Sequence, residues 1–156
     1  MTAIPKTTAV QRVQWEVSRE EYDAIRELFL RHCDRELAGD IDAVLETLTP
    51  DCLYELPQTG QRWEGHAGAR RFYEELLTAF PDNSWDLHDV VIGPQGVMSN
   101  VTMIAHQAAP FAGVDQIGSE VHWRLSNMFP WDPEAKKFRG EVLYYFRPES
   151  EYFVTK

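Results

Sequence analysis

A histidine on one face of a predicted helix is the first residue that could carry out chemistry. The segment Arg19–Ala38 has apolar or aromatic residues at three- and four-residue spacing, as on one face of an amphipathic helix. The residues on this face are Tyr22, Ile25, Phe29 and His32. His32 is therefore expected to point inward, where an imidazole with an ordinary pKa near neutrality could move a proton or bind a ligand.

Two further polar residues are predicted to lie on apolar faces of strands. Alternation along Ser119–Trp131 places Asn127 on the same side as apolar and aromatic residues only. Burying an unpaired amide costs about 1–3 kcal/mol, so His32, water or a ligand is expected to pair with it. In the last predicted strand, Glu141 shares a side with Leu143 and could reach the same interior. A carboxylate in apolar surroundings has a raised pKa, which suits acid–base chemistry.

Each of these residues also has a purely structural interpretation. His32 could be a core histidine bonded to a backbone carbonyl or a neighbouring side chain. Asn127 could make a structural hydrogen bond, and Glu141 could be a solvated rim residue paired with Arg139. The sequence leaves these alternatives open.

Composition restricts the class of protein. The chain has 156 residues, which is one domain by length, and 44% of them are hydrophobic. Its formal net charge of −10 argues against nucleic acids and anionic membranes as partners and suits a hydrophobic small molecule. Cys33 and Cys52 belong to no metal-binding pattern, and no motif indicates a cofactor. No apolar run resembles a signal peptide or a membrane span, so we expect a cytoplasmic protein.

The order of the predicted elements indicates the fold. Residues 1–17 form an N-terminal arm in which Val13, Trp15 and Val17 alternate, 18–148 form the domain, and 149–156 form a C-terminal tail. Helices are predicted at Arg19–Ala38, 41–48 and His66–Phe80; strands are predicted at Cys52–Leu56, Trp85–Ile92, Val97–Gln107, Ser119–Trp131 and Phe138–Arg147. Helices followed by strands predict an α+β fold, in which a cone-shaped, curved antiparallel sheet packs against three helices of the N-terminal half. Such a cone encloses a pocket, the usual place for a ligand.

Several segments, taken in order, resemble the nuclear transport factor 2-like superfamily, and within it the SnoaL-like polyketide cyclases and ketosteroid isomerases. These segments are RHCDRELAGDIDAVLETLTPD, the strand ending at Pro57, WEGHAGARRFYEELLTAFPD, APFAGVDQIGSEV and the closing strands ending in Tyr144-Tyr145. The resemblance covers roughly residues 20–147. It implies the cone fold described above, and it implies a homodimer, which is common in relatives.

The resemblance also implies roles for particular positions. His32, eight residues before Asp40, stands where ketosteroid isomerases have an oxyanion-binding tyrosine, and Asn127 stands at their second donor position. The catalytic carboxylates do not carry over. Leu56 occupies the position of the isomerase base, and Leu143 that of the cyclase and epoxide hydrolase aspartates.

Two hypotheses follow from these observations. The first is a cofactor-independent isomerase, cyclase or lyase that acts through an enolate-like intermediate on a hydrophobic, carbonyl-bearing molecule of polyketide or steroid type. Its catalytic residues would be His32, Asn127 and Glu141, with Glu141 as the base and His32 as the alternative base. Its substrate-binding residues would be Tyr22, Phe29, Tyr54, Leu56, Trp123, Phe129, Leu143 and Tyr145. The second hypothesis, favoured by the missing carboxylates, is a non-catalytic small-molecule-binding or dimerisation module of the same fold.

Overall fold

The computed structural model describes residues 9–146, in which four helices precede or interrupt a six-stranded sheet. The helices are α1 (Ala9–Val13), α2 (Arg19–Leu37), α3 (Ile41–Leu45) and α4 (Gly65–Ala79). The strands are β1 (Leu48–Leu56), β2 (Gln61–Glu64), β3 (Ser84–Gly93), β4 (Gly96–His106), β5 (Glu120–Asp132) and β6 (Lys137–Phe146). The predicted α+β fold is confirmed.

Helix α2 begins and ends where its sequence signals predict. The Ser18 hydroxyl accepts a hydrogen bond from the Glu21 amide at 3.1 Å, which satisfies one unpaired donor of the first turn. The helix ends before Gly39, whose positive φ of 68° suits the residue that follows a helix. Its buried face consists of Ile25, Leu28, Phe29 and His32.

The sheet is curved and open, with strand order β2-β1-β6-β5-β4-β3. The prediction of a wholly antiparallel sheet is wrong at one place, because β1 and β6 are parallel neighbours. Gly140 lies opposite Leu53 in this pair, and a Cβ at position 140 would lie 2.0 Å from the Leu53 carbonyl oxygen. The close approach of the two strands therefore requires glycine at this point.

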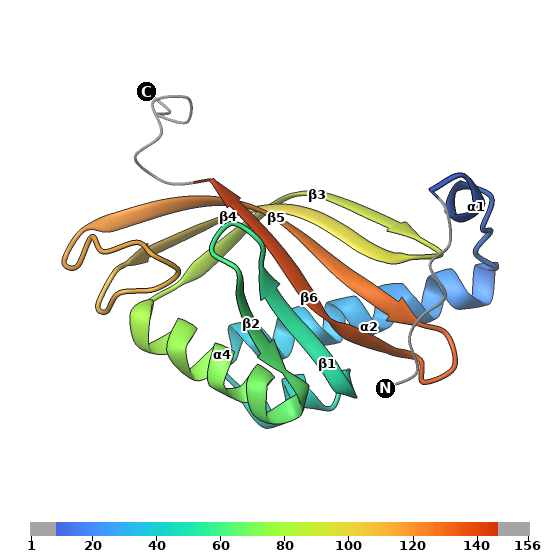
Figure 1. Ribbon diagram of the computed structural model, residues 1–156, viewed down its shortest axis with the longest axis horizontal. Helices are drawn as coiled ribbons and strands as arrows, with labels where there is room; N and C mark the ends of the chain where they lie inside the picture. Colours follow the sequence, from blue (N-terminus) through green and yellow to red (C-terminus); the bar gives the residue numbers. More distant parts are fainter. Residues whose placement is uncertain (1–8, 147–156) are drawn as a thin grey trace.

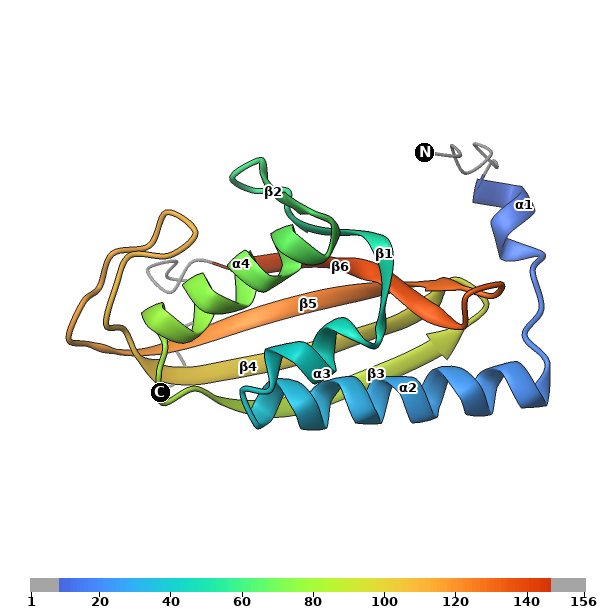
Figure 2. The ribbon, with the colours of Figure 1, turned by 90° about the horizontal axis from the view of Figure 1, so that it is seen from below.

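The helices α2, α3 and α4 cover one face of the sheet, as Figures 1 and 2 show. The loop between β4 and β5 lies at the end of the sheet near the C-terminus of α4, and the turn between β5 and β6 lies at the opposite end. The core is therefore enclosed between the helices and the inner face of the sheet.

Three local features go beyond the elements predicted from the sequence. The N-terminal arm contains the short helix α1, which ends at Val13, and residues 1–8 lie outside the described part of the chain. Strand β1 begins at Leu48, earlier than the strand predicted from Cys52, and runs through Pro50. Strand β2 was not predicted; it precedes α4 and pairs antiparallel with β1. The tail at 149–156 also lies outside the described residues, and within 9–146 no helix is long and apolar enough to cross a bilayer.

Candidate functional site

His32 lies in the interior and is part of a chain of hydrogen bonds. Its side chain is 0% exposed. Its Nδ1 atom is 2.7 Å from the Thr47 hydroxyl, and its Nε2 atom is 3.2 Å from the Tyr73 hydroxyl. The Tyr73 oxygen is in turn 2.8 Å from the Tyr54 hydroxyl. The chain thus joins α2, α4, β1 and the residue that precedes β1.

The donor and acceptor in each of these hydrogen bonds can be assigned by starting from Thr47. Thr47 has one hydroxyl hydrogen and donates it to the Val44 carbonyl at 2.6 Å, so its oxygen must accept from Nδ1–H of His32. Burial lowers the pKa of His32 to about 4, so the ring is neutral at pH 7 and Nε2 is an acceptor. Tyr73 therefore donates to His32, and Tyr54 donates to Tyr73. Both ring nitrogens of His32 are used within the protein.

Glu141 lies beside this chain on the inner face of β6. It is 3% exposed, and the parallel pairing of β1 and β6 places its Cα opposite that of Tyr54. The alternative in which Glu141 pairs with Arg139 is not observed among the described residues, since Arg139 binds Asp132 at 2.6 Å. Burial raises the pKa of Glu141 well above its usual value, and the charge of Glu36 raises it further. Glu141 is thus a buried carboxyl group whose surroundings favour its neutral form.

Glu36 is the second carboxyl group of this region. It stands four residues after His32 on α2, and its Oε2 atom is 3.9 Å from His32 Nε2. Its side chain is 18% exposed, and burial raises its pKa to about 7. We call His32, Glu36, Thr47, Tyr54, Tyr73 and Glu141 the polar cluster.

Asn127 occupies the inner face of β5, as predicted. It is 6% exposed, its Cα lies opposite that of Leu143, and Leu143 is two residues from Glu141 on the same strand. No hydrogen-bond partner for its Oδ1 atom is present among residues 9–146. The indole Nε1 of Trp123, farther along the same face, is also buried without a partner in that range. Buried polar atoms of this kind are expected to meet water or a ligand.

The residues predicted to bind substrate fall into two groups. Seven of them are buried between the sheet and the helices: Phe29, Tyr54, Leu56, Trp123, Phe129, Leu143 and Tyr145. The eighth, Tyr22, is half-buried near the start of α2, about 15 Å along the helix from His32. Its ring faces the guanidinium of Arg19 at 6.0 Å. Tyr22 is therefore separated from the polar cluster.

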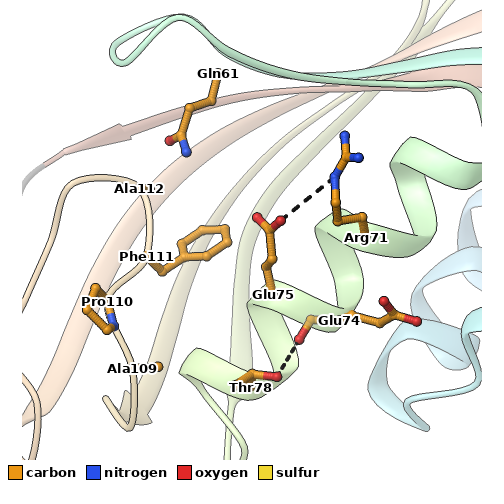
Figure 3. A pocket seen from close by; sticks show the side chains of 9 residues that line it. All are labelled: Gln61, Arg71, Glu74, Glu75, Thr78, Ala109, Pro110, Phe111 and Ala112. Atoms are coloured by element: carbon orange, nitrogen blue, oxygen red, sulfur yellow. Dashed lines mark hydrogen bonds and ion pairs between the residues drawn. The ribbon is translucent and has the colours of Figure 1, made fainter.

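An open hollow of about 370 Å³ lies elsewhere, between α4 and the loop that precedes β5. Figure 3 shows Phe111 and Glu75 facing this hollow from opposite sides, with Glu75 paired to Arg71 at 3.9 Å. It is lined by Gln61, Arg71, Glu74, Glu75, Thr78, Ala109, Pro110, Phe111 and Ala112. None of the predicted site residues lines it. Within the described part of the chain, no group of three or more potential metal ligands is present.

Three members of the polar cluster were not among the predicted site residues. Glu36 carries a signal in the sequence, because a residue four positions after His32 lies on the same face of a helix. Tyr73 lies on α4, and its hydroxyl contact with Tyr54 depends on tertiary packing. Thr47 lies between α3 and β1, and nothing in the local sequence indicates its contact with His32.

Comparison with known proteins decides the family. The family model of the SnoaL-like domain matches residues 29–147, which is most of the chain and contains every member of the polar cluster. This chain belongs to the SnoaL-like domain family. Among curated proteins, none matches the chain.

Solved structures share this SnoaL-like fold. A protein from Jannaschia sp. CCS1, assigned as a SnoaL-like polyketide cyclase, is 20% identical with a TM-score of 0.71, over 84% of this chain and 91% of its own. AclR from Streptomyces galilaeus, assigned as a hydroxylase, is 20% identical with a TM-score of 0.66, over 81% and 92%. A protein from Bacillus subtilis, assigned as an isomerase, is 13% identical with a TM-score of 0.63, over 81% and 88%. At these identities the likeness establishes the fold, and the different assignments show that the fold alone does not define a reaction.

Proposed function

We propose that this SnoaL-like protein is a cofactor-independent isomerase, cyclase or lyase that moves protons on a hydrophobic, carbonyl-bearing small molecule. The observation that carries the proposal is Glu141, a buried carboxyl group with a raised pKa and no ion-pairing cation among the described residues. A raised pKa makes the ionised carboxylate a stronger base, which suits removal of a proton from a carbon next to a carbonyl group.

The neighbouring groups can stabilise the charge that this step creates. When the carbon–hydrogen bond breaks, its electron pair moves toward the carbonyl oxygen, and the proton goes to Glu141. The Asn127 Nδ2–H group would donate to the substrate oxygen. Its Oδ1 atom, which lacks a partner in the described chain, would accept a hydrogen bond from a neighbouring hydroxyl group. His32 would contribute by holding Tyr73 and Tyr54 in place, since both of its nitrogens already have partners. The protonated Glu141 would then return the proton to another atom of the intermediate.

Proton exchange at carbon tests this proposal without knowledge of the natural product. The protein is incubated in D2O with a panel of hydrophobic ketones, diketones and cyclic enones, and deuterium uptake next to the carbonyl is followed by NMR. We expect catalysed uptake in at least one probe and a loss of about 100-fold or more in Glu141→Gln. The matched control is Glu55→Gln, because Glu55 lies on β1 next to Tyr54 but on the opposite side of the strand.

A binding module of the same fold is the second candidate. It is favoured by Leu56 and Leu143, two buried apolar residues where catalytic relatives have carboxylates. Binding of a probe without any deuterium uptake would support this candidate over the enzyme, and unchanged uptake in Glu141→Gln would remove the assigned base. A homodimer, a cytoplasmic location and the exclusion of nucleic acids stay predictions.

A further inference from the structure

The indole nitrogen of Trp123 is a buried hydrogen-bond donor that the proposed reaction leaves unused. Trp123 is 1% exposed, and its Nε1–H group has no partner in the described part of the chain. Two other indole groups are satisfied by the protein. Trp85 donates to Asn83 Oδ1 at 2.8 Å, and Trp131 donates to Glu21 Oε1 at 2.9 Å. Nearly all buried polar groups in folded proteins are hydrogen-bonded, so the Trp123 donor requires an explanation.

Aromatic rings hold this donor in a fixed orientation. The ring of Tyr145 stacks on the Trp123 indole with the centroids 5.3 Å apart, and the Phe80 ring meets it edge-on at 5.1 Å. The Tyr145 hydroxyl already donates to the Ala112 carbonyl at 2.6 Å. A buried water makes two to four hydrogen bonds to polar groups, and these rings offer few of them. A ligand that presents an acceptor oxygen on an apolar body fits these surroundings better than water does.

A second unpaired polar atom lies on the same face of β5. Asn127 Oδ1 is buried without a partner in the described chain, and Asn127 follows Trp123 by four residues. A strand rises about 3.3 Å per residue, so the two Cα atoms are about 13 Å apart. Leu125 stands between them, points to the same side and is 3% exposed. This stretch of β5 thus has a polar group at each end and an apolar residue in the middle.

The two polar groups lie toward different regions of the protein. Asn127 lies toward the polar cluster, since its Cα is opposite that of Leu143, two residues from Glu141. Trp123 lies toward the open hollow, since Phe111 lines that hollow and its ring centroid is 6.2 Å from that of Trp123. The Asn127 end is therefore next to the proposed base, and the Trp123 end is farther from it.

We propose that the Trp123 indole N–H binds a second oxygen atom of the substrate, at the end remote from the reacting carbonyl group. Trp123 is then a specificity-determining residue, and the inference rests on the proposed function for the position of the reacting carbonyl at Asn127. Because an indole N–H group can only donate, the second oxygen must be an acceptor. A neutral ketone, ester or ether oxygen is favoured over a carboxylate, because the surrounding rings do not compensate a buried negative charge. The substrate class is thus an elongated, apolar molecule with an acceptor oxygen at each end.

NMR of protein labelled with ¹⁵N-tryptophan tests this contact directly. The sequence has five tryptophans, and the indole cross-peak that disappears in Trp123→Phe belongs to Trp123. The probe is 4,4′-diacetylbiphenyl, a rod-shaped apolar molecule with a ketone at each end. We expect the Trp123 indole proton to move downfield with this diketone but not with 4,4′-diethylbiphenyl, which has the same shape and no oxygen. A Trp123 cross-peak that stays in place, or that moves equally with the hydrocarbon, would overturn the proposal.

Affinity measurements test whether the second oxygen determines specificity. One hydrogen bond is worth roughly 10-fold in Kd, so wild-type protein should bind 4,4′-diacetylbiphenyl more tightly than 4-acetyl-4′-ethylbiphenyl by about that factor. In Trp123→Phe, which keeps an aromatic ring, the two dissociation constants should become nearly equal. Trp131→Phe is the matched control and should keep the preference, because that indole already donates to Glu21. Comparison of two ligands on one variant cancels general effects on folding, so a preference that survives in Trp123→Phe would rule out the role of Trp123.

The outcomes separate this inference from the proposed function. Deuterium uptake into the acetyl groups of the diketone reports on catalysis, and the Trp123 cross-peak reports on the second contact. Uptake that is lost in Glu141→Gln, together with an unmoved Trp123 cross-peak, would support the proposed function and refute the Trp123 contact. A Trp123 cross-peak that moves without any catalysed uptake would support the contact while the enzyme assignment fails.

Discussion

Two regions of the protein interior are held together by different kinds of contact. One is the polar cluster, where hydrogen bonds link α2, α4 and β1 and where two carboxyl groups have no ion-pairing cation within residues 9–146. The other is an aromatic cluster of Phe80, Phe111, Trp123 and Tyr145. The Trp123 and Tyr145 rings stack at 5.3 Å, and the Phe80 ring meets Trp123 edge-on at 5.1 Å.

The aromatic cluster also fixes the loop that covers it. The Gln107 amide donates to the carbonyls of Ala109 and Val114 at 2.9 and 2.8 Å, and its oxygen accepts from the Gln116 amide at 2.7 Å. Tyr145 donates its hydroxyl hydrogen to the Ala112 carbonyl at 2.6 Å. Apolar burial and satisfied hydrogen bonds therefore act together in this region. We infer that the aromatic cluster stabilises the protein, whereas burial of the titratable groups of the polar cluster costs stability.

Removal of the Trp123 indole is expected to have the largest effect. Trp123 is 1% exposed and packs against three aromatic rings, so Trp123→Ala should lower the free energy of unfolding by about 3–5 kcal/mol. Urea denaturation measures this loss. Trp15→Ala is the control, because Trp15 is exposed before α2 and its removal should cost less than about 1 kcal/mol. Equal losses in the two variants would contradict the assignment of stability to the aromatic cluster.

Acidification is expected to act on the polar cluster. The unfolded chain protonates His32 near pH 6.5, whereas the native protein does so only near pH 4. The unfolded state thus binds more protons in this window, and stability is lost as pH falls through it, by up to about 3 kcal/mol. Glu36 acts in the opposite direction, since its raised pKa costs stability as pH rises from about 4.5 toward 7.

The contribution of His32 is isolated by comparing variants. The difference in unfolding free energy between wild type and His32→Gln, measured in urea at pH 7, 5.5 and 4.5, should shrink as the pH falls. His122→Gln is the control, because His122 is an exposed residue of β5 that binds Glu120. A constant difference across this range would mean that the pKa of His32 is the same in the native and unfolded states, in conflict with its burial.

The fold could be predicted from local sequence signals because its elements carry strong ones. Such signals are the serine before α2, the glycine after it and the alternation along β5, and the structure has a cap, a helix end and a strand at these places. The parallel pairing of β1 with β6 could not be predicted, since strand order depends on long-range packing. Its clue is Gly140, whose missing Cβ admits the Leu53 carbonyl, but a single glycine in a strand has several explanations.

The sequence indicated on which faces the candidate residues lie, but it did not indicate their hydrogen-bond partners. His32 and Asn127 are buried as expected, because helical and strand periodicity indicates which face a residue occupies. Glu141, which the sequence left open between the interior and the rim, is buried as well. The partners of His32 are Thr47 and Tyr73, which are 15 and 41 residues away in the chain, and no local pattern indicates such contacts. The roles of these residues in binding or catalysis stay predictions.

Two residues with left-handed backbones, one at each end of the molecule, give the smallest expected effects. Ala112, in the loop over the aromatic cluster, has φ of 53°, and Lys136, in the turn before β6, has φ of 51°. Such a backbone costs a non-glycine residue about 1–2 kcal/mol, and glycine relieves this strain at an entropic cost of about 0.5–1 kcal/mol. Lys136→Gly should therefore raise the free energy of unfolding by about 0.5–1 kcal/mol.

At Ala112, the loss of a buried methyl group opposes the gain in stability that glycine brings. Ala112 is buried, and loss of its methyl group costs about 0.8 kcal/mol, so Ala112→Gly is expected to change stability by roughly zero. Thermal unfolding of the two variants side by side measures the difference. If Ala112→Gly stabilises the protein as much as Lys136→Gly, the methyl group contributes nothing to packing. The loop would then be held by the hydrogen bonds of Gln107 and Tyr145 and not by apolar contact.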